Sequence, residues 1–232
     1  MRYNDFEIWV SQPRIFRYIY ACDCNKRQAL ALYRANIRLS QAIFAILGLF
    51  EIALRNAIDN HYCKTFGSNW LYDAVQPAGF LRAKGCEKSL VSVKAVITKL
   101  GPDYTHNKAI AELTFGFWTH QFNSKHFQAS GSTLLKIFPT RPFATNHTAI
   151  FNILSGINRL RNRIAHHEPI CFEKPVDISA CYATKQYQQI LEVMQWLGIN
   201  TPSFLFGIDR VLQEANSIHN ISKPFNVFVM DE

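Results

Sequence analysis

Residues 26–64, KRQALALYRANIRLSQAIFAILGLFEIALRNAIDNHYCK, decide the fold class of this chain. Apolar residues recur in this stretch at the spacing of an α-helix, whereas the period-two alternation that marks β-strands is nearly absent from the sequence. The stretch is longer than an ordinary globular helix, so we expect either a break near Gly48 or one helix that forms the spine of the domain. An all-α fold follows.

Capping and breaking residues on both sides of this stretch predict further helices. The long helix itself begins after the cap Asp23-Cys24-Asn25 and ends at Gly67-Ser68-Asn69. Since no linker interrupts the series, we expect one domain over residues 1–217 and a C-terminal tail over residues 218–232. The other predicted helices run from Pro13 to about Ala21, over Lys84–Leu100, from Asn107 through Phe115, Trp118 and Phe122, over Phe127–Ile137, from Asn146 or Thr148 to about His166, from Ser179 to Gly198 and from Thr201 to about Asn216.

Composition narrows the class of protein and of partner. The 232 residues are 48% hydrophobic and 18% charged, which excludes a globally disordered chain. A net charge of +8 favours a polyanionic partner, nucleic acid before membrane. Residues 82–141 carry nine Lys or Arg against three Asp or Glu, and this excess suits a solvated helix face and an RNA-binding surface equally well. Lys84, Lys88 and Lys94 are the candidate RNA contacts in this region.

Several other classes of site and location find no support in the sequence. The six cysteines form no C-x-x-C pair, and Asp5 and Glu7 interrupt any secretory signal, so we expect reduced thiols in the cytoplasm. The most apolar run, Ala42–Phe50, is nine residues long, whereas a membrane span needs about 20. We expect no metal site, since H-E-x-x-H is absent and His166, His167 and Glu168 are adjacent rather than spaced along one helix face. The sequence has no glycine-rich phosphate loop, which argues against a nucleotide-driven motor or a kinase, and we expect no cofactor.

The chemically informative stretch is Leu160–Pro169, LRNRIAHHEP. Arg161 follows Ile157 by four residues and continues the apolar stripe of Ile150, Leu154 and Ile157, so its guanidinium requires an anion, either a carboxylate or a bound phosphate. Asn162 and His166 are neighbours at i, i+4, where the amide can orient the imidazole. Arg159, Arg163 and His167 fall on a third strip, on which the two arginines are candidate RNA contacts and His167 is a candidate supporting residue.

These residue types suit phosphodiester chemistry. A histidine can exchange protons near neutral pH, and an arginine can stabilise negative charge that builds on phosphorus. RNA supplies its own nucleophile, the ribose 2′-hydroxyl, so the reaction requires no metal. A buried polar network at a helix end explains the same residues without any catalysis, and the spacing alone favours that alternative.

A resemblance to known proteins favours the catalytic interpretation over the buried polar network. Arg161-Asn162-x-x-x-His166 resembles the R-N-x-x-x-H motif of the HEPN superfamily, all-helical proteins that include metal-independent ribonucleases. The longer stretch over residues 160–170 is similar to the signature of the Abi-like family of bacterial abortive-infection proteins. Three further segments agree with that family, and together the matches span roughly residues 10–215: Ala29-Leu30-x-Leu32-Tyr33, Glu51-x-x-Leu54-Arg55-Asn56-x-Ile58 and Leu113-Thr114-Phe115-Gly116-Phe117-Trp118.

The resemblance implies a HEPN-type helical bundle with additional helices and an endoribonuclease of a phage-defence or toxin system. His166 would act as general acid or base, Arg161 would bind the phosphate, and Asn162 would orient the histidine. Positions five apart on an ideal helix differ by about 140°, so Arg161 and His166 need a distorted helix end or a second copy of the motif across a homodimer. An antitoxin is compatible with this class. The alternative is a noncatalytic module of the same fold that binds RNA or a protein partner.

An internal repeat of the motif pattern, called the echo below, identifies residues that could support the site. Leu54-Arg55-Asn56-Ala57-Ile58 repeats the L-R-N-x-I pattern of Leu160–Ile164, and His61 follows Arg55 by six residues. The echo could form a second half-site. Structural support is the stronger interpretation, because Glu51 and Arg55 are i, i+4 neighbours that can pair with each other or with Arg161.

Overall fold

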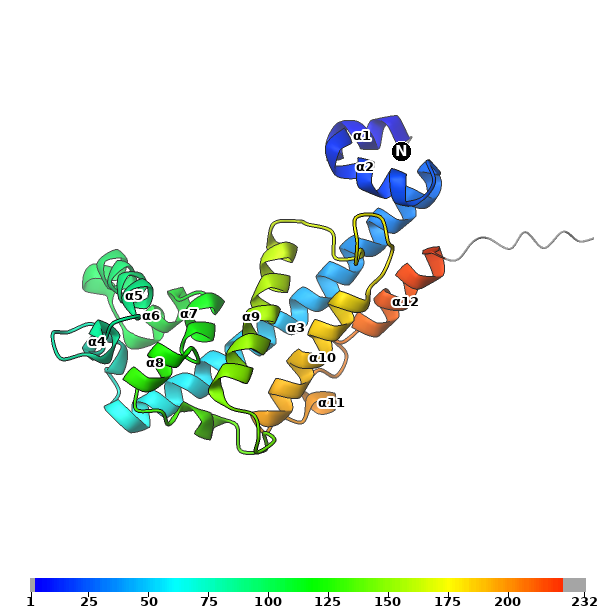
Figure 1. Ribbon diagram of the computed structural model, residues 1–232. Coiled ribbons are helices and arrows are strands. Elements are labelled where there is room, and N and C mark those ends of the chain that lie inside the picture. The colour runs from blue at the N-terminus through cyan, green and yellow to red at the C-terminus, as the bar shows by residue number, and fades with distance from the viewer. Residues whose placement is uncertain (1–2, 223–232) are drawn as a thin grey trace, which may run out of the picture. The chain divides into compact units, whose positions relative to one another are not determined.

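The computed structural model describes residues 3–222 and shows an all-α protein, as predicted (Figure 1). In this range no β-strand forms, and the one β-type pairing is an isolated antiparallel bridge between Phe172 and Ile178. Three short 3₁₀ helices, η1 (Phe80–Arg82), η2 (Gly101–Asp103) and η3 (Leu134–Ile137), accompany the α-helices. The α-helices are α1 (Tyr3–Val10), α2 (Gln12–Ala21), α3 (Lys26–Phe66), α4 (Trp70–Asp73), α5 (Glu87–Leu100), α6 (His106–Glu112), α7 (Phe115–His120), α8 (Ser124–Ala129), α9 (His147–Ala165), α10 (Cys181–Trp196), α11 (Thr201–Phe204) and α12 (Val211–Ser222).

The long stretch is one helix of 41 residues, α3, and no break occurs at Gly48. Asn25 caps its start, with its Oδ1 accepting from the Gln28 N–H at 3.1 Å. Gly48 lies on the exposed face of the helix. Its low helix propensity does not break α3, because the buried residues on the opposite face stabilise the helix. The buried residues follow at steps of three or four along the whole helix: Ala29, Leu32, Asn36, Leu39, Ile43, Ile46, Phe50, Leu54, Ile58 and Tyr62.

Helix α3 is also long and apolar enough, by length and composition alone, to cross a membrane, and no other helix in residues 3–222 meets that criterion. Its most apolar 18-residue window has a mean hydropathy of 1.8, and 33% of the window is buried. The core helix of a water-soluble protein passes the same test, so the finding is weak evidence for a span. The periodic buried stripe is the pattern of a core helix.

The chain divides into two compact units. The first unit holds the residues up to Ile46, Leu160–Gln188 and the residues from Phe206 onward. The second unit holds Leu47–Arg159 and Gln189–Leu205. Three helices, α3, α9 and α10, each contribute residues to both units.

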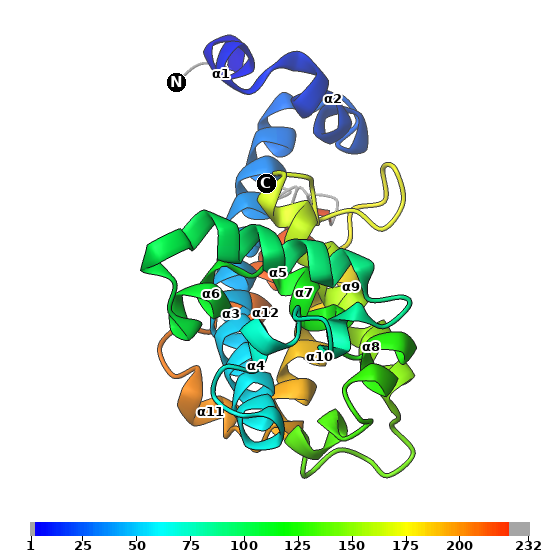
Figure 2. The ribbon, with the colours of Figure 1, turned by 90° about the vertical axis from the view of Figure 1, so that its left-hand side faces the viewer.

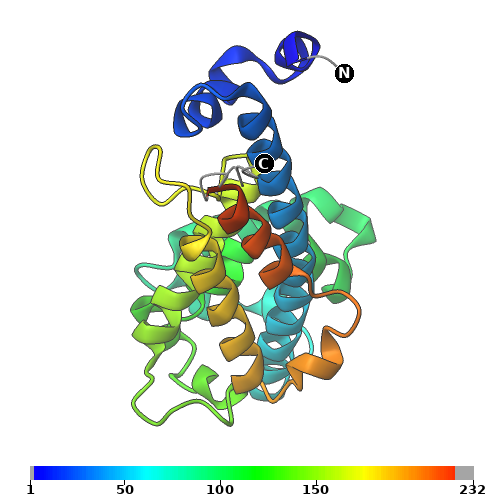
Figure 3. The same ribbon diagram turned by 90° about the vertical axis from the view of Figure 1, so that its right-hand side faces the viewer.

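In the first unit, α12 lies beside the first half of α3 (Figure 3). Arg38 on α3 pairs with Glu214 on α12 at 3.0 Å, and Gln28 Nε2 donates to the Ile221 carbonyl at 2.7 Å. An aromatic cluster joins α2 to α3, since Tyr18 makes edge contacts with the rings of Tyr33 and Phe172. These contacts fix the scaffold on which the segment after α9 is anchored.

In the second unit, α5 lies against α4, α6 and α7 (Figure 2). The core here is aromatic: Tyr62 on α3 contacts the rings of Trp70 and Phe80, and Phe50 contacts Phe115. Both Trp70 and Tyr62 are fully buried. Large planar side chains of this kind contribute much of the apolar area that such a helical unit removes from water.

Three predicted helices are wrong in detail, because each is two shorter elements. The helix after Asn107 is capped instead by Thr105, whose Oγ1 accepts from Lys108 N, and extended Thr114 divides it into α6 and α7. The predicted helix over residues 127–137 is divided into α8 and η3 by Gly131 and Ser132, which have positive φ values.

The last predicted helix is divided into α11 and α12, with Gly207 at φ +74° between them. Helix α12 continues to Ser222, so residues 218–222 of the predicted tail are helical. The rest of that predicted tail, residues 223–232, lies outside the described residues.

Candidate functional site

The motif residues lie at the C-terminal end of α9. The helix begins at His147 and is capped by Asn146, one of its two predicted starts. The Asn146 Oδ1 accepts from the Ala149 N–H at 2.9 Å. Its buried face carries the predicted stripe and continues through Leu160 and Ile164. These contacts rotate the helix so that Arg161 is half-buried at the edge of the stripe, whereas Asn162 is exposed. The stripe therefore determines which motif side chains reach solvent.

Helix α9 ends at Ala165 in a Schellman motif. His167 adopts a left-handed conformation with φ +56°, a position that usually holds glycine. Its N–H donates to the Ile164 carbonyl at 3.0 Å, and the Glu168 N–H donates to the Arg163 carbonyl at 2.8 Å. The chain therefore leaves the helix axis directly after His166.

The side chains at this end of α9 face solvent. His166 and His167 are both exposed, and neither imidazole has a hydrogen bond to any residue of the described range 3–222. The contact between Asn162 and His166 is a backbone one, from the His166 N–H to the Asn162 carbonyl at 2.9 Å. Arg161 differs, because its Nε is buried without a hydrogen-bond partner. An available imidazole and a sheltered guanidinium thus project from adjacent turns.

Arg163, a predicted RNA contact, holds the chain where it leaves α9. Its Nη2 donates to the Pro169 carbonyl, and its Nε lies 3.6 Å from Glu168 Oε2. The guanidinium also lies 5.1 Å from the centroid of the Tyr182 ring on α10, a cation–π arrangement. These three contacts fix the turn that carries His166 and His167.

The loop after the motif is anchored at two further places. The buried Asn36 side chain accepts from the Ile170 N–H at 2.8 Å. Arg17 on α2 donates to the carbonyls of Pro175 and Lys174 at 2.6 and 3.0 Å, and its guanidinium lies 4.3 Å from the centroid of the Phe172 ring. Sequence analysis missed both anchors, although a polar Asn36 in the apolar stripe of α3 was a detectable signal.

A polar pocket of about 310 Å³ adjoins Arg163. It combines two cations, Arg163 and Lys185, with the half-buried ring of Tyr182. Cations beside an aromatic ring are the usual elements of a site for phosphate and base. Sequence analysis did not identify it, because its residues come from the end of α9, the following loop and the first turns of α10. The full lining is Arg163, Phe172, Glu173, Cys181, Tyr182 and Lys185.

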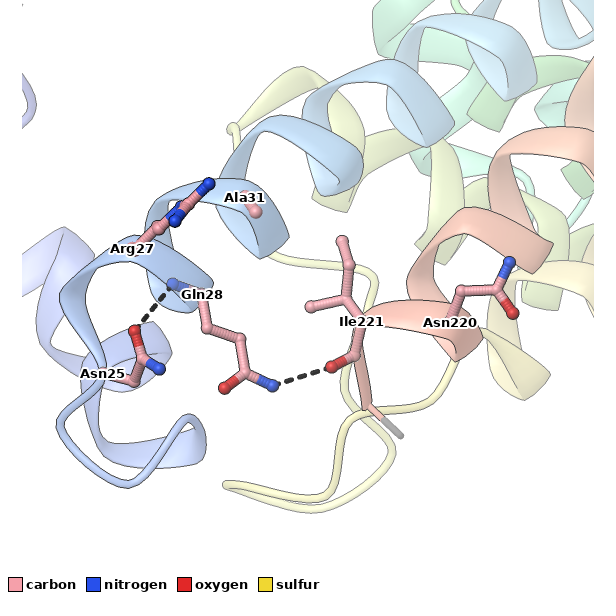
Figure 4. Close-up of a pocket in the computed structure, with 6 residues that line it drawn as sticks. All are labelled: Asn25, Arg27, Gln28, Ala31, Asn220 and Ile221. Carbon is pink, nitrogen blue, oxygen red and sulfur yellow. Dashed lines mark hydrogen bonds between the residues drawn. The ribbon is translucent and has the colours of Figure 1, made fainter. Parts of the chain in front are cut away.

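A larger pocket, of about 520 Å³, lies elsewhere in the first unit, between the start of α3 and the end of α12 (Figure 4). The Gln28 side chain reaches across it to the Ile221 carbonyl. None of the predicted catalytic residues lines this pocket, and its other lining residues, Asn25, Arg27, Ala31 and Asn220, carry a single charge. Size alone therefore does not identify the functional site.

The predicted basic surface lies in the second unit. Lys84, Lys88 and Lys94 are exposed on α5 or just before it, and Arg159 is exposed on α9. A neighbouring lysine, Lys99, is paired with Glu112 at 2.5 Å. The three predicted lysines remain candidates for phosphate contacts because their side chains are in solvent.

The echo residues also lie in the second unit, on α3. Glu51 and Arg55 are half-buried, and Arg55 Nε is buried without a hydrogen-bond partner. His61 is held by Thr133 Oγ1 at 2.9 Å, and burial, followed by Lys136 and Lys64, lowers its pKa. A neutral, bonded His61 fits a packing role, which was the interpretation that the sequence favoured over a second half-site.

At the end of α9, no three donors among the described residues converge closely enough to hold one metal ion. Among residues 3–222 one group of three converges, Asp59, Cys63 and His106, and it belongs to the second unit. None of the predicted catalytic residues is part of this group. The end of α9 carries imidazole, guanidinium and carboxylate groups, from His166, Arg161 and Glu168 among others.

Comparison with known proteins found a match to one protein family. The pattern that defines the Abi-like protein family matches residues 14–171, a range that includes most of α2 and the whole of α3 and of α9 with its terminal turn. No curated protein and no solved structure matched the chain. Because the family match covers well over half of the sequence, the chain belongs to the Abi-like protein family.

Proposed function

We propose that this chain is a metal-independent endoribonuclease of an abortive-infection or toxin system. The observation that carries the proposal is the exposed His166 imidazole, which has no hydrogen bond within residues 3–222 and follows Arg161 by five residues at the end of α9. A histidine kept only for structure is normally bonded, as His61 is. The R-N-x-x-x-H spacing of these residues and the family membership support a nuclease of the HEPN type.

In the proposed reaction, a base removes the proton of a ribose 2′-hydroxyl and the 2′-oxygen attacks the adjacent phosphorus. The bond from phosphorus to the 5′-oxygen breaks, and an acid returns a proton to that leaving oxygen. The products are a 2′,3′-cyclic phosphate and a 5′-hydroxyl. His166 serves as one of the two proton-transfer groups, and the Arg161 guanidinium stabilises the additional negative charge on the phosphorane.

Two copies of the motif would complete this chemistry. One His166 can perform one of the two proton transfers in a single step, so a homodimer that places both copies at one scissile phosphate supplies the base and the acid. The exposed position of His166 at a helix end is compatible with such pairing. The oligomeric state of the purified chain, measured by light scattering, tests this part of the proposal.

Separate residues supply general attraction for RNA. The net charge of +8 and the exposed Lys84, Lys88, Lys94 and Arg159 favour phosphate contacts whose strength falls with salt. The pocket at Arg163, Tyr182 and Lys185 adds a cationic and aromatic surface next to the motif. We assign binding to these groups and bond cleavage to Arg161 and His166.

Product chemistry tests the proposal directly. The purified full chain is incubated with end-labelled RNA in the presence of EDTA, and the new ends are identified by their reactivity with phosphatase and kinase. We expect 2′,3′-cyclic phosphate and 5′-hydroxyl ends, with cleavage unaffected by the chelator. Products with 5′-phosphate ends would contradict the proposed mechanism.

A noncatalytic RNA-binding module is the second candidate, and the exposed lysines on and before α5 favour it. It predicts tight, salt-sensitive binding without cleavage, lost on charge reversal at Lys88 but unchanged in His166→Ala. Growth assays separate the two candidates as well, because only the nuclease predicts that expression is toxic and that His166→Ala removes the toxicity.

A further inference from the structure

We propose that Asp59, Cys63 and His106 form a site for a zinc ion in the second unit. The three side chains offer one carboxylate oxygen, one sulfur and one imidazole nitrogen, and these donor atoms lie within 4.8 Å of one another. Asp59 and Cys63 are one turn apart on α3, and His106 is the first residue of α6. The pairing of two helices thus brings together donors that are 43 residues apart in the chain.

The distances between the donors fit a common ion. His106 Nε2 lies 2.8 Å from Asp59 Oδ1, and Cys63 Sγ lies 3.6 Å from that oxygen and 3.9 Å from that nitrogen. Three such distances define a circle of about 2.0 Å radius, so one point lies about that far from all three atoms. Zinc bonds to nitrogen and oxygen are roughly 2.0–2.2 Å long, and those to sulfur about 2.3 Å. The donor triangle therefore has the size of one face of a zinc tetrahedron.

Neighbouring residues orient the donors. The indole N–H of the buried Trp70 donates to Asp59 Oδ1 at 2.7 Å, and the Trp70 ring packs edge-on against the His106 ring at 6.0 Å between centroids. Thr105 caps α6 and fixes where His106 begins. Such outer contacts are typical of metal sites, in which they hold the ligands in the geometry that the ion requires.

The arrangement does not suit the other chemistry of a Cys–His–Asp set. In a nucleophilic triad, the thiol and the carboxylate address opposite nitrogens of the imidazole. Here both face Nε2, whereas Nδ1 is buried without a hydrogen-bond partner. The geometry is that of three donors around one point.

The donor set and its exposure indicate which ion fits and how it is held. Mixed sulfur, nitrogen and oxygen ligands suit zinc rather than magnesium or calcium, which take oxygen ligands. The side chains of His106 and Asp59 are 15% and 18% exposed, so solvent reaches the edge of the cluster. Three protein ligands leave the fourth position of the tetrahedron to water.

Cobalt titration of the purified full chain tests the site, because tetrahedral Co²⁺ absorbs strongly in the visible range and a bound thiolate adds a near-ultraviolet charge-transfer band. We expect one Co²⁺ per chain with both features, and displacement of the cobalt by one equivalent of Zn²⁺. In Cys63→Ser the charge-transfer band disappears. In His106→Ala the affinity falls by roughly 100-fold or more, since even outer-contact changes lower affinity about 10–100-fold.

Matched variants distinguish this site from adventitious binding by thiols. Cys24 and Cys181 are exposed, and Cys24→Ser and Cys181→Ser leave the cobalt spectrum unchanged. Trp70→Phe keeps an aromatic ring but removes the donor to Asp59, and we expect cobalt to bind about tenfold more weakly with the same spectrum. Absence of tetrahedral bands at stoichiometric cobalt in the folded wild-type chain, or a charge-transfer band that survives Cys63→Ser, overturns the proposal.

Discussion

Five histidines of this chain divide between two contrasting environments. At the end of α9, His166 and His167 are exposed, and their imidazoles have no hydrogen bond to residues 3–222. In the second unit, His61, His106 and His126 are each sheltered and bonded, to Thr133, Asp59 and Ser89 respectively. An exposed imidazole can act on a ligand and adds little to stability, whereas a bonded interior one holds helices together. Changes at the two places should therefore alter different measurable properties.

A large effect on activity is expected at Arg161. In Arg161→Ala we expect the single-turnover rate of RNA cleavage to fall by roughly 10²–10³-fold, because the group that stabilises the phosphorane is lost. Arg161→Lys keeps the charge but lacks the planar fork, so we expect it to recover only part of that loss. Circular dichroism and thermal melting check that both variants fold. Full activity in both would remove Arg161 from the proposed site.

Acid should destabilise the fold through the buried His126. Burial of His126, and then the nearby His120, lowers its pKa from 6.5 to about 4. Between these values the unfolded chain binds a proton that the folded chain does not, so stability falls as the pH drops from 6.5 to about 4. The loss amounts to about 3 kcal/mol below both values.

Chemical denaturation at several pH values measures this effect. His126→Gln retains hydrogen-bonding capacity without a titrating group, and we expect its stability to decline less steeply with acid than that of the wild type. Equal acid sensitivity in wild type and His126→Gln would show that His126 does not govern the transition.

A smaller effect is expected where the exposed end of α9 is anchored to the interior. Asn36→Ala leaves the buried Ile170 N–H without its acceptor, which costs about 1–3 kcal/mol. Asn60→Ala, at an exposed position of the same helix, should change the free energy of unfolding by less than about 0.5 kcal/mol. Urea denaturation of the two variants compares them. Equal stability of the two would mean that the anchor contributes nothing.

The smallest expected effect is a gain in stability. His167 holds a left-handed conformation at φ +56°, which places its Cβ unfavourably. His167→Gly should stabilise the chain by about 1 kcal/mol, and His167→Ala, which keeps a Cβ, should not. Thermal melting of the pair isolates the contribution of that one carbon atom. If His167→Gly melts no higher than His167→Ala, strain at this turn is not a feature of the end of α9.

Sequence patterns predicted the fold where one helix face or one strong cap determined it. The spacing of apolar residues predicted α3 and α9, and Asn25 and Pro13 marked helix starts correctly. The division at Thr114 was missed because no glycine or proline marks it, and the packing of Phe115 and Trp118 in the core determines where α7 begins. A break at Gly48 was one of two expectations for α3, and the helix is continuous there because its opposite face is buried along the whole length.

The two histidine environments were unequally visible in the sequence. Arg161, Asn162 and His166 lie in one short segment, so a motif could identify them, and their roles remain a prediction. The convergence of Cys63 and His106 depends on the pairing of α3 with α6 across 43 residues, which no local pattern encodes. Anchors such as Arg17 on the carbonyl of Pro175 depend equally on tertiary structure.

The rate of RNA cleavage by His166→Ala, measured under single-turnover conditions against wild type, tests the central claim most directly. The control is His120→Ala, which removes another exposed histidine from the second unit. We predict that His166→Ala loses roughly 10²–10⁴-fold in rate, the range of general acid–base catalysis, with an unchanged melting temperature, while His120→Ala cleaves at the wild-type rate. Cleavage by folded His166→Ala at the wild-type rate would contradict the account.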